Sequence, residues 1–247
     1  MRVAFLGATK GMGRALARRM AERGDRLALL GRDEVDLQRS ARDLEVRGGS
    51  GAHVSTVRCD LEDVASFDGA LASAEERLGG GLDAVVVTAG MFATQERLEA
   101  DPSLTHRLLQ VNFANTVAFC ETARKRLLAR GGGTLCVFSS VAGERGRKPV
   151  VLYGATKAGL TRYLEGIDHR FHAQGLRTVC VKPGFVKTGM TAGLRPPPFA
   201  AEPDEVARRV LRAIDRGAPV VYAPPIWWAI MRVIRSLPRF VMRRIRF

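Results

Sequence analysis

The feature that most limits how this chain can fold is a short apolar run followed directly by three closely spaced glycines. Residues 3–6 read Val-Ala-Phe-Leu, and Gly7, Gly11 and Gly13 follow in the spacing Gly-x-x-x-Gly-x-Gly before a predicted helix over 14–23. Glycine lets the backbone turn tightly and lets a phosphate approach the amide groups at a helix N-terminus. This strand, turn and helix together predict a dinucleotide site at the edge of a parallel sheet.

Apolar strand-like runs alternate with helical stretches along the rest of the chain. The predicted strands cover 26–30, 53–58, 84–87, 134–138, 177–181 and 220–222, and the predicted helices cover 34–47, 64–78, 102–130, 153–173 and 204–216. Such alternation is typical of one parallel sheet with right-handed crossovers. We therefore expect an α/β fold with a single doubly wound Rossmann-type domain, about seven strands in the order 3-2-1-4-5-6-7. Residues 1–225 would form this domain, followed by a tail at 226–247.

The composition limits the partners and the compartment. A net charge of +14 over 247 residues favours an anionic partner such as phosphate or an acidic membrane surface. No nucleic-acid recognition motif accompanies that charge, so we expect no nucleic acid to bind. The cysteines, which we expect to be buried free thiols, are Cys59, Cys120, Cys136 and Cys180. Without metal-ligand spacing, a signal-like start or a run of about twenty uncharged apolar residues, the sequence predicts a cytoplasmic protein that holds no metal.

A serine, a tyrosine and a lysine in the second half of the chain have the spacing of an acid–base site. Tyr153 and Lys157 stand four residues apart, so on a helix they share one face. A nearby ammonium favours the phenolate and would lower the pKa of Tyr153 toward neutral pH. Ser140 follows the predicted strand 134–138, at the strand end where open α/β sheets bind ligands. A hydroxyl, an acidified phenol and a cation together suit the protonation of a carbonyl oxygen during hydride transfer.

The second predicted strand ends in residues that bear on the choice of dinucleotide. Sites that prefer NAD usually carry an acid at the end of this strand for the ribose 2′-hydroxyl. Here Gly31 and Arg32 occupy that place, and Lys10 lies within the glycine turn. Two cations suit a 2′-phosphate, which favours NADP over NAD.

Other strand ends carry residues suited to the rest of a dinucleotide. Asp60 follows the third strand and is placed to accept a hydrogen bond from an adenine, and small residues at 88–90 leave room for adenosine. After the sixth strand, Thr188 follows a Pro183-Gly184 turn and is placed to hold a carboxamide. The proline-rich segment 189–203 is predicted to form a flap over the pocket.

The tail at 226–247 is basic, aromatic and free of acidic residues. Its arginines recur every three or four positions: Arg232, Arg235, Arg239, Arg243 and Arg246. Trp227 and Ile234 belong to the opposite, apolar side, and Pro238 divides the segment into two predicted helices. An amphipathic pair of this kind suits the surface of an anionic membrane, although packing on the body or on another subunit remains the alternative.

Together these motifs resemble the short-chain dehydrogenase/reductase family across 1–222. The resemblance implies a catalytic set of Asn112, Ser140, Tyr153 and Lys157, in which Tyr153 donates the proton, Lys157 lowers its pKa and binds the nicotinamide ribose, Ser140 polarises the carbonyl and Asn112 holds a relay water. The cofactor-binding set that the motifs and the resemblance imply is Gly7, Thr9, Lys10, Gly11, Met12, Gly13, Arg32, Asp60, Leu61, Ala89, Gly90, Tyr153, Lys157, Pro183, Gly184, Val186 and Thr188. Thr88 departs from the asparagine usual in the family. The family also implies a homodimer or homotetramer.

The segments 139–147, 153–160 and 182–192, with the tail, look most like the decaprenylphosphoryl-2-keto-ribose reductase group, which reduces a keto sugar carried on a polyprenyl phosphate. The expectation is an NADPH-dependent reductase of a small-molecule or lipid-linked keto substrate, at the inner face of the cell membrane. The basic residues Arg145, Arg147 and Lys148 would then meet the lipid phosphate. The alternatives are a reductase of soluble ketones, of 3-ketoacyl, steroid or polyketide type, and a non-catalytic dinucleotide-binding scaffold.

Overall fold

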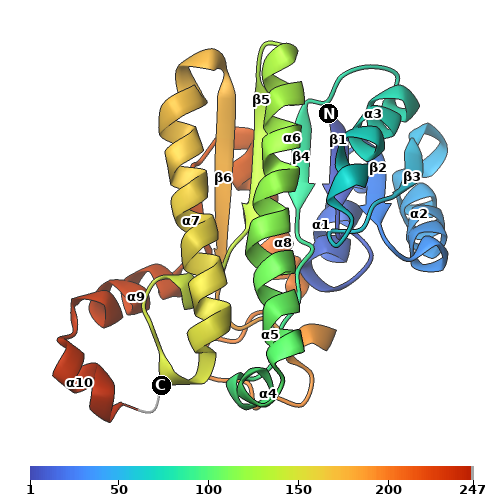
Figure 1. Cartoon of the computed structure of the whole chain (residues 1–247). Coiled ribbons are helices and arrows are strands. Elements are labelled where there is room, and N and C mark those ends of the chain that lie inside the picture. The colour runs from blue at the N-terminus through green and yellow to red at the C-terminus, as the bar shows by residue number, and fades with distance from the viewer. Residues whose placement is uncertain (246–247) are drawn as a thin grey trace.

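The computed structural model describes residues 1–245 and has one α/β domain with a seven-stranded, wholly parallel sheet in the order β3-β2-β1-β4-β5-β6-β7 (Figure 1). The strands are β1 (Arg2–Leu6), β2 (Arg26–Gly31), β3 (Val54–Arg58), β4 (Ala84–Val87), β5 (Gly133–Phe138), β6 (Leu176–Pro183) and β7 (Val220–Ala223). The helices are α1 (Gly11–Glu22), α2 (Glu34–Gly48), α3 (Phe67–Leu78), α4 (Gln95–Ala100), α5 (Pro102–Leu109), α6 (Asn115–Ala129), α7 (Val151–Phe171), α8 (Pro203–Arg216), α9 (Ile226–Ser236) and α10 (Arg239–Arg244). The predicted fold class and strand order are confirmed.

Both faces of the sheet are buried, which explains why its strands read as continuous apolar runs. In β1, Val3 and Phe5 enter one core, while Ala4 and Leu6 enter the other. Helices α3, α6 and α7 cover the first face, and α1, α2 and α8 cover the second. Figure 1 shows α6 and α7 running in front of the sheet, with α8 behind it. The four cysteines are free and buried, as expected.

One long predicted helix is interrupted at Asn112, a predicted catalytic residue. The segment expected to be helical over 102–130 contains α5, then a π-helical turn over Gln110–Ala114, then α6. The turn holds Asn112, whose side-chain amide donates to the Met91 carbonyl and accepts from the Met91 amide, both at 2.8 Å. An extra residue per turn of this kind reorients a side chain within a helix, and such bulges occur often at functional sites. Periodicity of apolar residues does not reveal it.

The C-terminal segment folds back onto the body as two short helices, at the lower left of Figure 1. Trp227, Met231 and Ile234 of α9 are buried against Val141. The helices part at Pro238, as predicted, because a proline disfavours helical backbone in the residue before it, here Leu237 with ψ 133°. Arg246, on the predicted basic side, lies outside the described residues. No helix within 1–245 is long and apolar enough to span a bilayer.

Candidate active site

A cavity of about 500 Å³ opens at the carboxyl ends of β1 to β4. β1 lies between β2 and β4 at the point where the strand order reverses, and ligands of doubly wound sheets bind at such a crevice. The predicted cofactor residues that line it are Gly7, Thr9, Lys10, Gly11, Met12, Gly13, Arg32, Asp60, Leu61, Ala89, Gly90 and Thr188. Residues from four strand ends, distant in sequence, therefore share one cavity.

Gly7 and Gly13 of the glycine turn lie so close to neighbouring atoms that a side chain fits at neither position. Gly7 has φ +97°, and a Cβ there would lie 2.5 Å from the Ala89 amide nitrogen. A Cβ at Gly13 would lie 2.2 Å from the Gly7 carbonyl oxygen. The Thr88 hydroxyl donates to this same carbonyl at 2.8 Å and so ties the end of β4 to the turn. The departure at Thr88 from the family's usual asparagine thus supplies a link between β1 and β4.

The N-terminus of α1 faces this cavity and carries no acidic residue of its own. Lys10 precedes α1 without capping it by a side-chain hydrogen bond, and the first turn of α1 has no acidic residue. The first amide groups of a helix and its dipole attract phosphate. Together with glycines that leave no bulk between turn and ligand, the residues present fit the pyrophosphate of a dinucleotide.

The two cations predicted to favour NADP line the cavity, and each has an acidic neighbour. Lys10 Nζ lies 2.7 Å from a carboxylate oxygen of Asp36, and the hydrogen bond from Lys10 holds the pKa of Asp36 below its usual range. Arg32 lies 3.7 Å from Glu62. Arg107 of α5 donates to the same Glu62 carboxylate at 2.6 Å. Sequence reasoning missed Asp36, Glu62 and Arg107, because they come from helices and loops with no motif of their own.

At the third strand end, a turn places the residues expected near adenine. The Asp60 carboxylate accepts from the Glu62 amide at 3.1 Å, which shapes the turn after β3. Asn115, at the start of α6, donates a hydrogen bond from its side-chain amide to the Leu61 carbonyl at 2.7 Å. Asn115 is therefore a positioning residue that the sequence did not single out.

The two adjacent serines after β5 have different roles. Ser139 is buried, and its hydroxyl donates to the Lys157 carbonyl at 2.9 Å and contacts the Thr161 hydroxyl at 2.8 Å. Ser140 instead caps the short turn over 141–143, accepting from the Ala142 amide at 3.1 Å. The Ser140 side chain also interacts with Tyr153, an interaction that favours a lower pKa for the phenol. Ser139 thus holds α7 in place, while Ser140 belongs to the predicted site.

Tyr153 and Lys157 lie on one face of α7, as predicted. Lys157 Nζ is 5.8 Å from the centre of the Tyr153 ring and donates to the Phe138 carbonyl at 2.9 Å. Burial raises the pKa of Tyr153 to about 12, against the opposing effect of the hydrogen bond with Ser140. Burial also lowers the pKa of Lys157 to about 8. The sequence argument expected a lowered pKa for Tyr153, but burial raises it instead, so at neutral pH the phenol is protonated.

Asn112 and α7 meet at the edge of the cavity. A Cβ on Gly90 would lie 3.2 Å from Asn112 Oδ1 and 3.8 Å from Lys157 Nζ. Phe92 packs its ring edge against Tyr153 with 5.2 Å between ring centres. Because Gly90 also lines the cavity, Asn112 and Lys157 stand next to it. The four predicted catalytic residues come from the loop after β5, from α7 and from the π-helical turn.

The turn after β6 is placed only partly as expected. Thr188 lines the cavity beside Gly11, where an added Cβ would lie 3.2 Å from the Thr188 methyl group. Pro183, Gly184 and Val186 are not among the residues that line that cavity. Gly184 packs instead against Trp227, and Val186 is buried and pairs with Ala201 at the base of the predicted flap.

The basic loop after Ser140 contacts the tail. Arg145 donates to the Leu237 carbonyl at 2.8 Å, and Lys148 donates to the Arg243 carbonyl at 2.6 Å. These two side chains, expected to meet a lipid phosphate, therefore bind the carbonyl ends of α9 and α10.

Comparison with known proteins shows the family of this chain. The family model described as "short chain dehydrogenase" matches residues 2–198. The chain belongs to the short-chain dehydrogenase family. It is an oxidoreductase, as its relatives' names indicate.

Two relatives and one solved structure illustrate the similarity. An uncharacterized oxidoreductase of Mycobacterium tuberculosis (strain ATCC 25618 / H37Rv) is 33% identical over 245 residues, covering 98% of this chain and 96% of that protein. Carbonyl reductase family member 4 of Xenopus laevis is 26% identical over 220 residues, covering 86% and 90%. The structure of a short-chain dehydrogenase from Sphingobium yanoikuyae in complex with NADPH has a TM-score of 0.81 at 26% identity, covering 100% of this chain and 97% of that one.

Proposed function

We propose that this enzyme is an NADPH-dependent reductase of a carbonyl group, with Asn112, Ser140, Tyr153 and Lys157 at its catalytic centre. The observation that carries the proposal is the interaction between the side chains of Ser140 and Tyr153, with Lys157 Nζ 5.8 Å from the centre of the Tyr153 ring. This arrangement stands next to a cavity whose glycine turn fits a dinucleotide. Relatives named as a carbonyl reductase and as a short-chain dehydrogenase bound to NADPH support the same reaction class.

Each side chain has one task in such a reduction. The bound NADPH supplies a hydride to the carbonyl carbon. Tyr153 donates its proton to the carbonyl oxygen, since burial keeps the phenol protonated at neutral pH. Ser140 donates a hydrogen bond to the same oxygen as negative charge develops there. The Lys157 ammonium stabilises the phenolate that remains, and Asn112 fixes the backbone at Met91 beside them.

The test of the reaction class is transfer of the label from NADPH deuterated at C4. A panel of activated ketones and keto sugars is incubated with enzyme, and the alcohol products are analysed by mass spectrometry. We expect deuterium on the new carbinol carbon of at least one substrate. A protein that binds NADPH tightly and yet transfers no deuterium to any carbonyl would support the non-catalytic alternative.

We also propose a preference for NADP over NAD, supported by Lys10 and Arg32 in the cavity wall. A 2′-phosphate has to compete for these two cations with Asp36, which pairs with Lys10, and with Glu62, which pairs with Arg32. Arg32→Ala should therefore weaken NADPH binding far more than NADH binding, as measured by cofactor fluorescence titration. Equal weakening for the two cofactors contradicts the assignment.

For the substrate we propose a keto compound held at a membrane, with the lipid-linked keto sugar of the polyprenyl phosphate group as the leading example. The support lies in the outer face of the tail, where Trp228, Val233 and Phe240 are 53%, 62% and 61% exposed. Arg232 stacks over Trp228 at 5.5 Å, and residues 226–247 contain no acid. Exposed aromatic and aliphatic side chains among cations suit an anionic bilayer surface. A reductase of soluble ketones would have no use for this face.

Co-sedimentation with vesicles separates these two substrate classes. The wild-type enzyme should sediment with phosphatidylglycerol-containing vesicles and not with pure phosphatidylcholine. The double substitution Trp228→Ser with Phe240→Ser removes the apolar part of the face and should abolish sedimentation, whereas Arg212→Ala on α8 should not. Unchanged sedimentation of the double variant contradicts docking through the tail. Lipids that accumulate in cells lacking the protein would then identify the substrate.

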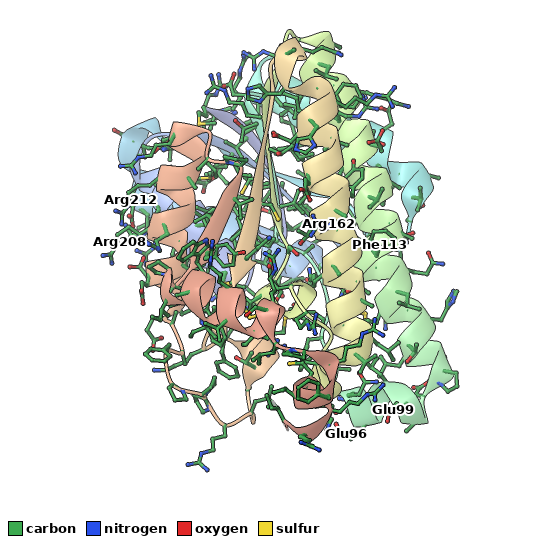
Figure 2. All side chains as sticks on the ribbon, turned by 90° about the vertical axis from the view of Figure 1, so that its left-hand side faces the viewer. Glu96, Glu99, Phe113, Arg162, Arg208 and Arg212 are labelled. Carbon is green, nitrogen blue, oxygen red and sulfur yellow. The ribbon has the colours of Figure 1, made fainter. Side chains whose placement is uncertain are left out.

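The family resemblance also leads us to propose a homodimer or homotetramer formed through α6 and α7. On this side Phe113 is 38% exposed, and Gly159 leaves room for its ring, since a Cβ there would lie 2.8 Å from it. Figure 2 shows Phe113 and Arg162 labelled on this side of the molecule. Light scattering should give a dimer or tetramer that Phe113→Asp dissociates. A monomeric wild type contradicts the proposal.

A further inference from the structure

The turn that carries the catalytic serine is held between two helices. Behind it, a Cβ on Gly143 would lie 2.6 Å from the Lys157 carbonyl carbon, so the turn packs directly on the backbone of α7. On its other side, Val141 packs against Trp227 and Met231 of α9, and all three side chains are at least 94% buried. Ser140 therefore lies at the start of a short segment enclosed by the catalytic helix and by the tail.

A buried carboxylate next to this turn binds cations from two other elements. The Glu144 side chain is only 5% exposed and accepts hydrogen bonds from Lys182 at the end of β6 and from Arg235 of α9, the latter at 3.2 Å. Burial opposes the charge on Glu144, but the hydrogen bond from Lys182 and the charges of Lys182 and Arg235 together outweigh it, and the pKa of Glu144 falls below its ordinary value. A buried carboxylate must stay paired, so this contact fixes the relative position of the serine loop, β6 and α9.

The turn after β6 rests on the same helix. The Gly184 amide donates to the Ala223 carbonyl at 3.0 Å, and a Cβ on Gly184 would lie 1.9 Å from Trp227 Nε1. The indole therefore packs directly against Gly184, and it leaves no space for any other residue at 184. Four residues later, Thr188 reaches the dinucleotide cavity.

We propose that α9 is a positioning element of the active site, which holds the Ser140 turn and the Pro183–Gly184 turn in register through Trp227 and through Arg235 on Glu144. The proposal rests on the carbonyl reduction proposed above. Trp227, Glu144 and Arg235 touch neither the phenol nor the cavity; they act through Ser140 and through the segment leading to Thr188. Figure 2 shows α9 lying across the lower part of the molecule, in front of the strand ends that carry these turns.

The variant that tests the proposal is Arg235→Ala, compared with Arg235→Lys and with Arg212→Ala. Arg235 is half exposed and Lys182 remains on Glu144, so the chain should still fold after the substitution. Arg212 is an arginine on the outer side of α8, labelled in Figure 2 and remote from both turns, and serves as the matched control. Trp227→Phe is a second, independent substitution that should weaken the packing of α9 on the body.

Three measurements separate positioning from general stability. With a small activated ketone and NADPH, well below the unfolding temperature, we expect Arg235→Ala and Trp227→Phe to lower kcat about tenfold, because small misplacements of catalytic groups cost this much or more. The dissociation constant of NADPH should change less than twofold. Hydrogen exchange at the amides of 141–145 should accelerate at least tenfold, while β1 stays protected. Arg235→Lys should restore kcat, and Arg212→Ala should match the wild type.

Two results overturn the inference. One is an unchanged kcat in Arg235→Ala and Trp227→Phe, whatever their melting temperatures. The other is unchanged exchange over 141–145. If the wild-type enzyme reduces no ketone, the proposed reaction fails, and the exchange experiment alone then decides: acceleration confined to the two turns supports the role of α9, and its absence refutes it.

Discussion

Replacing Gly13 by alanine is the smallest change that should damage both the fold and the dinucleotide site. A Cβ at this position would lie 2.2 Å from the Gly7 carbonyl oxygen and 2.5 Å from the Thr88 hydroxyl oxygen. Real Cβ atoms do not approach other heavy atoms within 3.0 Å, so α1 has to move away from β1 by about 0.8 Å. That shift also strains the hydrogen bond from Thr88 to Gly7, now 2.8 Å long.

The free-energy cost follows from these two contacts. Overpacking a filled core costs about 1–3 kcal/mol, and loss of a neutral hydrogen bond adds about 1 kcal/mol. We therefore expect Gly13→Ala to lower the free energy of unfolding by about 2–4 kcal/mol, which for a chain of this size lowers Tm by about 5–15 °C. The first amides of α1 move with the helix. Each charge-assisted hydrogen bond lost to a phosphate should weaken NADPH about ten- to hundredfold.

Urea unfolding and NADPH fluorescence titration measure the two effects separately. Gly69→Ala is the matched control, because Gly69 is exposed on α3 and nothing lies within 4 Å of its added Cβ. The control should gain up to about 1 kcal/mol, since alanine favours a helix more than glycine does. If Gly13→Ala has wild-type stability and binds NADPH within twofold of wild type, the close approach of α1, Gly7 and Thr88 is not what shapes this site.

Two further predictions concern the catalytic face. Ser139→Ala should lower the free energy of unfolding by about 1–3 kcal/mol with little effect on turnover, because the hydrogen bonds of Ser139 to α7 are structural. Ser140→Ala should instead lower turnover with little effect on the free energy of unfolding. Similar behaviour of both variants in urea unfolding and NADPH oxidation contradicts this division. Burial lowers the pKa of Lys157 from 10.5 to about 8, so keeping its charge buried at pH 7 destabilises the fold by about 3 kcal/mol. Lys157→Met should thus be inactive yet more stable than the wild type at pH 7. This difference in stability should shrink as the pH rises from about 8 to 10.5, because the wild type gains stability over that range. A methionine variant that is less stable than the wild type at pH 7 contradicts the burial of an ammonium here.

The parts of the structure that the sequence predicted are those with local signals. The run from Val3 to the glycine turn identifies β1 and the start of α1, because only glycine fits where backbone meets backbone. Continuous apolar strands alternating with helices indicate a parallel sheet, whose carboxyl ends bring Gly7, Asp60 and Thr188 to one cavity. The spacing of Tyr153 and Lys157 is helical, and α7 places both on one face.

The parts that the sequence did not predict depend on tertiary contacts. The π-helical turn at Asn112 exists because its amide binds the Met91 backbone, a pairing with no periodic trace. The raised pKa of Tyr153 depends on how deeply the phenol is buried, which spacing does not convey. Gly184 could be recognised as part of a turn, but its neighbour Trp227 arrives from α9, more than forty residues later. Glu144 reads as part of a basic loop until the fold brings Lys182 and Arg235 to it.

The central claim is that Tyr153 delivers the proton while the cofactor delivers hydride. Single-turnover oxidation of bound NADPH by an activated ketone, followed by the loss of nicotinamide absorbance in Tyr153→Phe, tests it most directly. The account predicts an NADPH dissociation constant within twofold of wild type and a hydride-transfer rate lower by at least a thousandfold, within the range of general acid catalysis. Near-normal hydride transfer in Tyr153→Phe would contradict it.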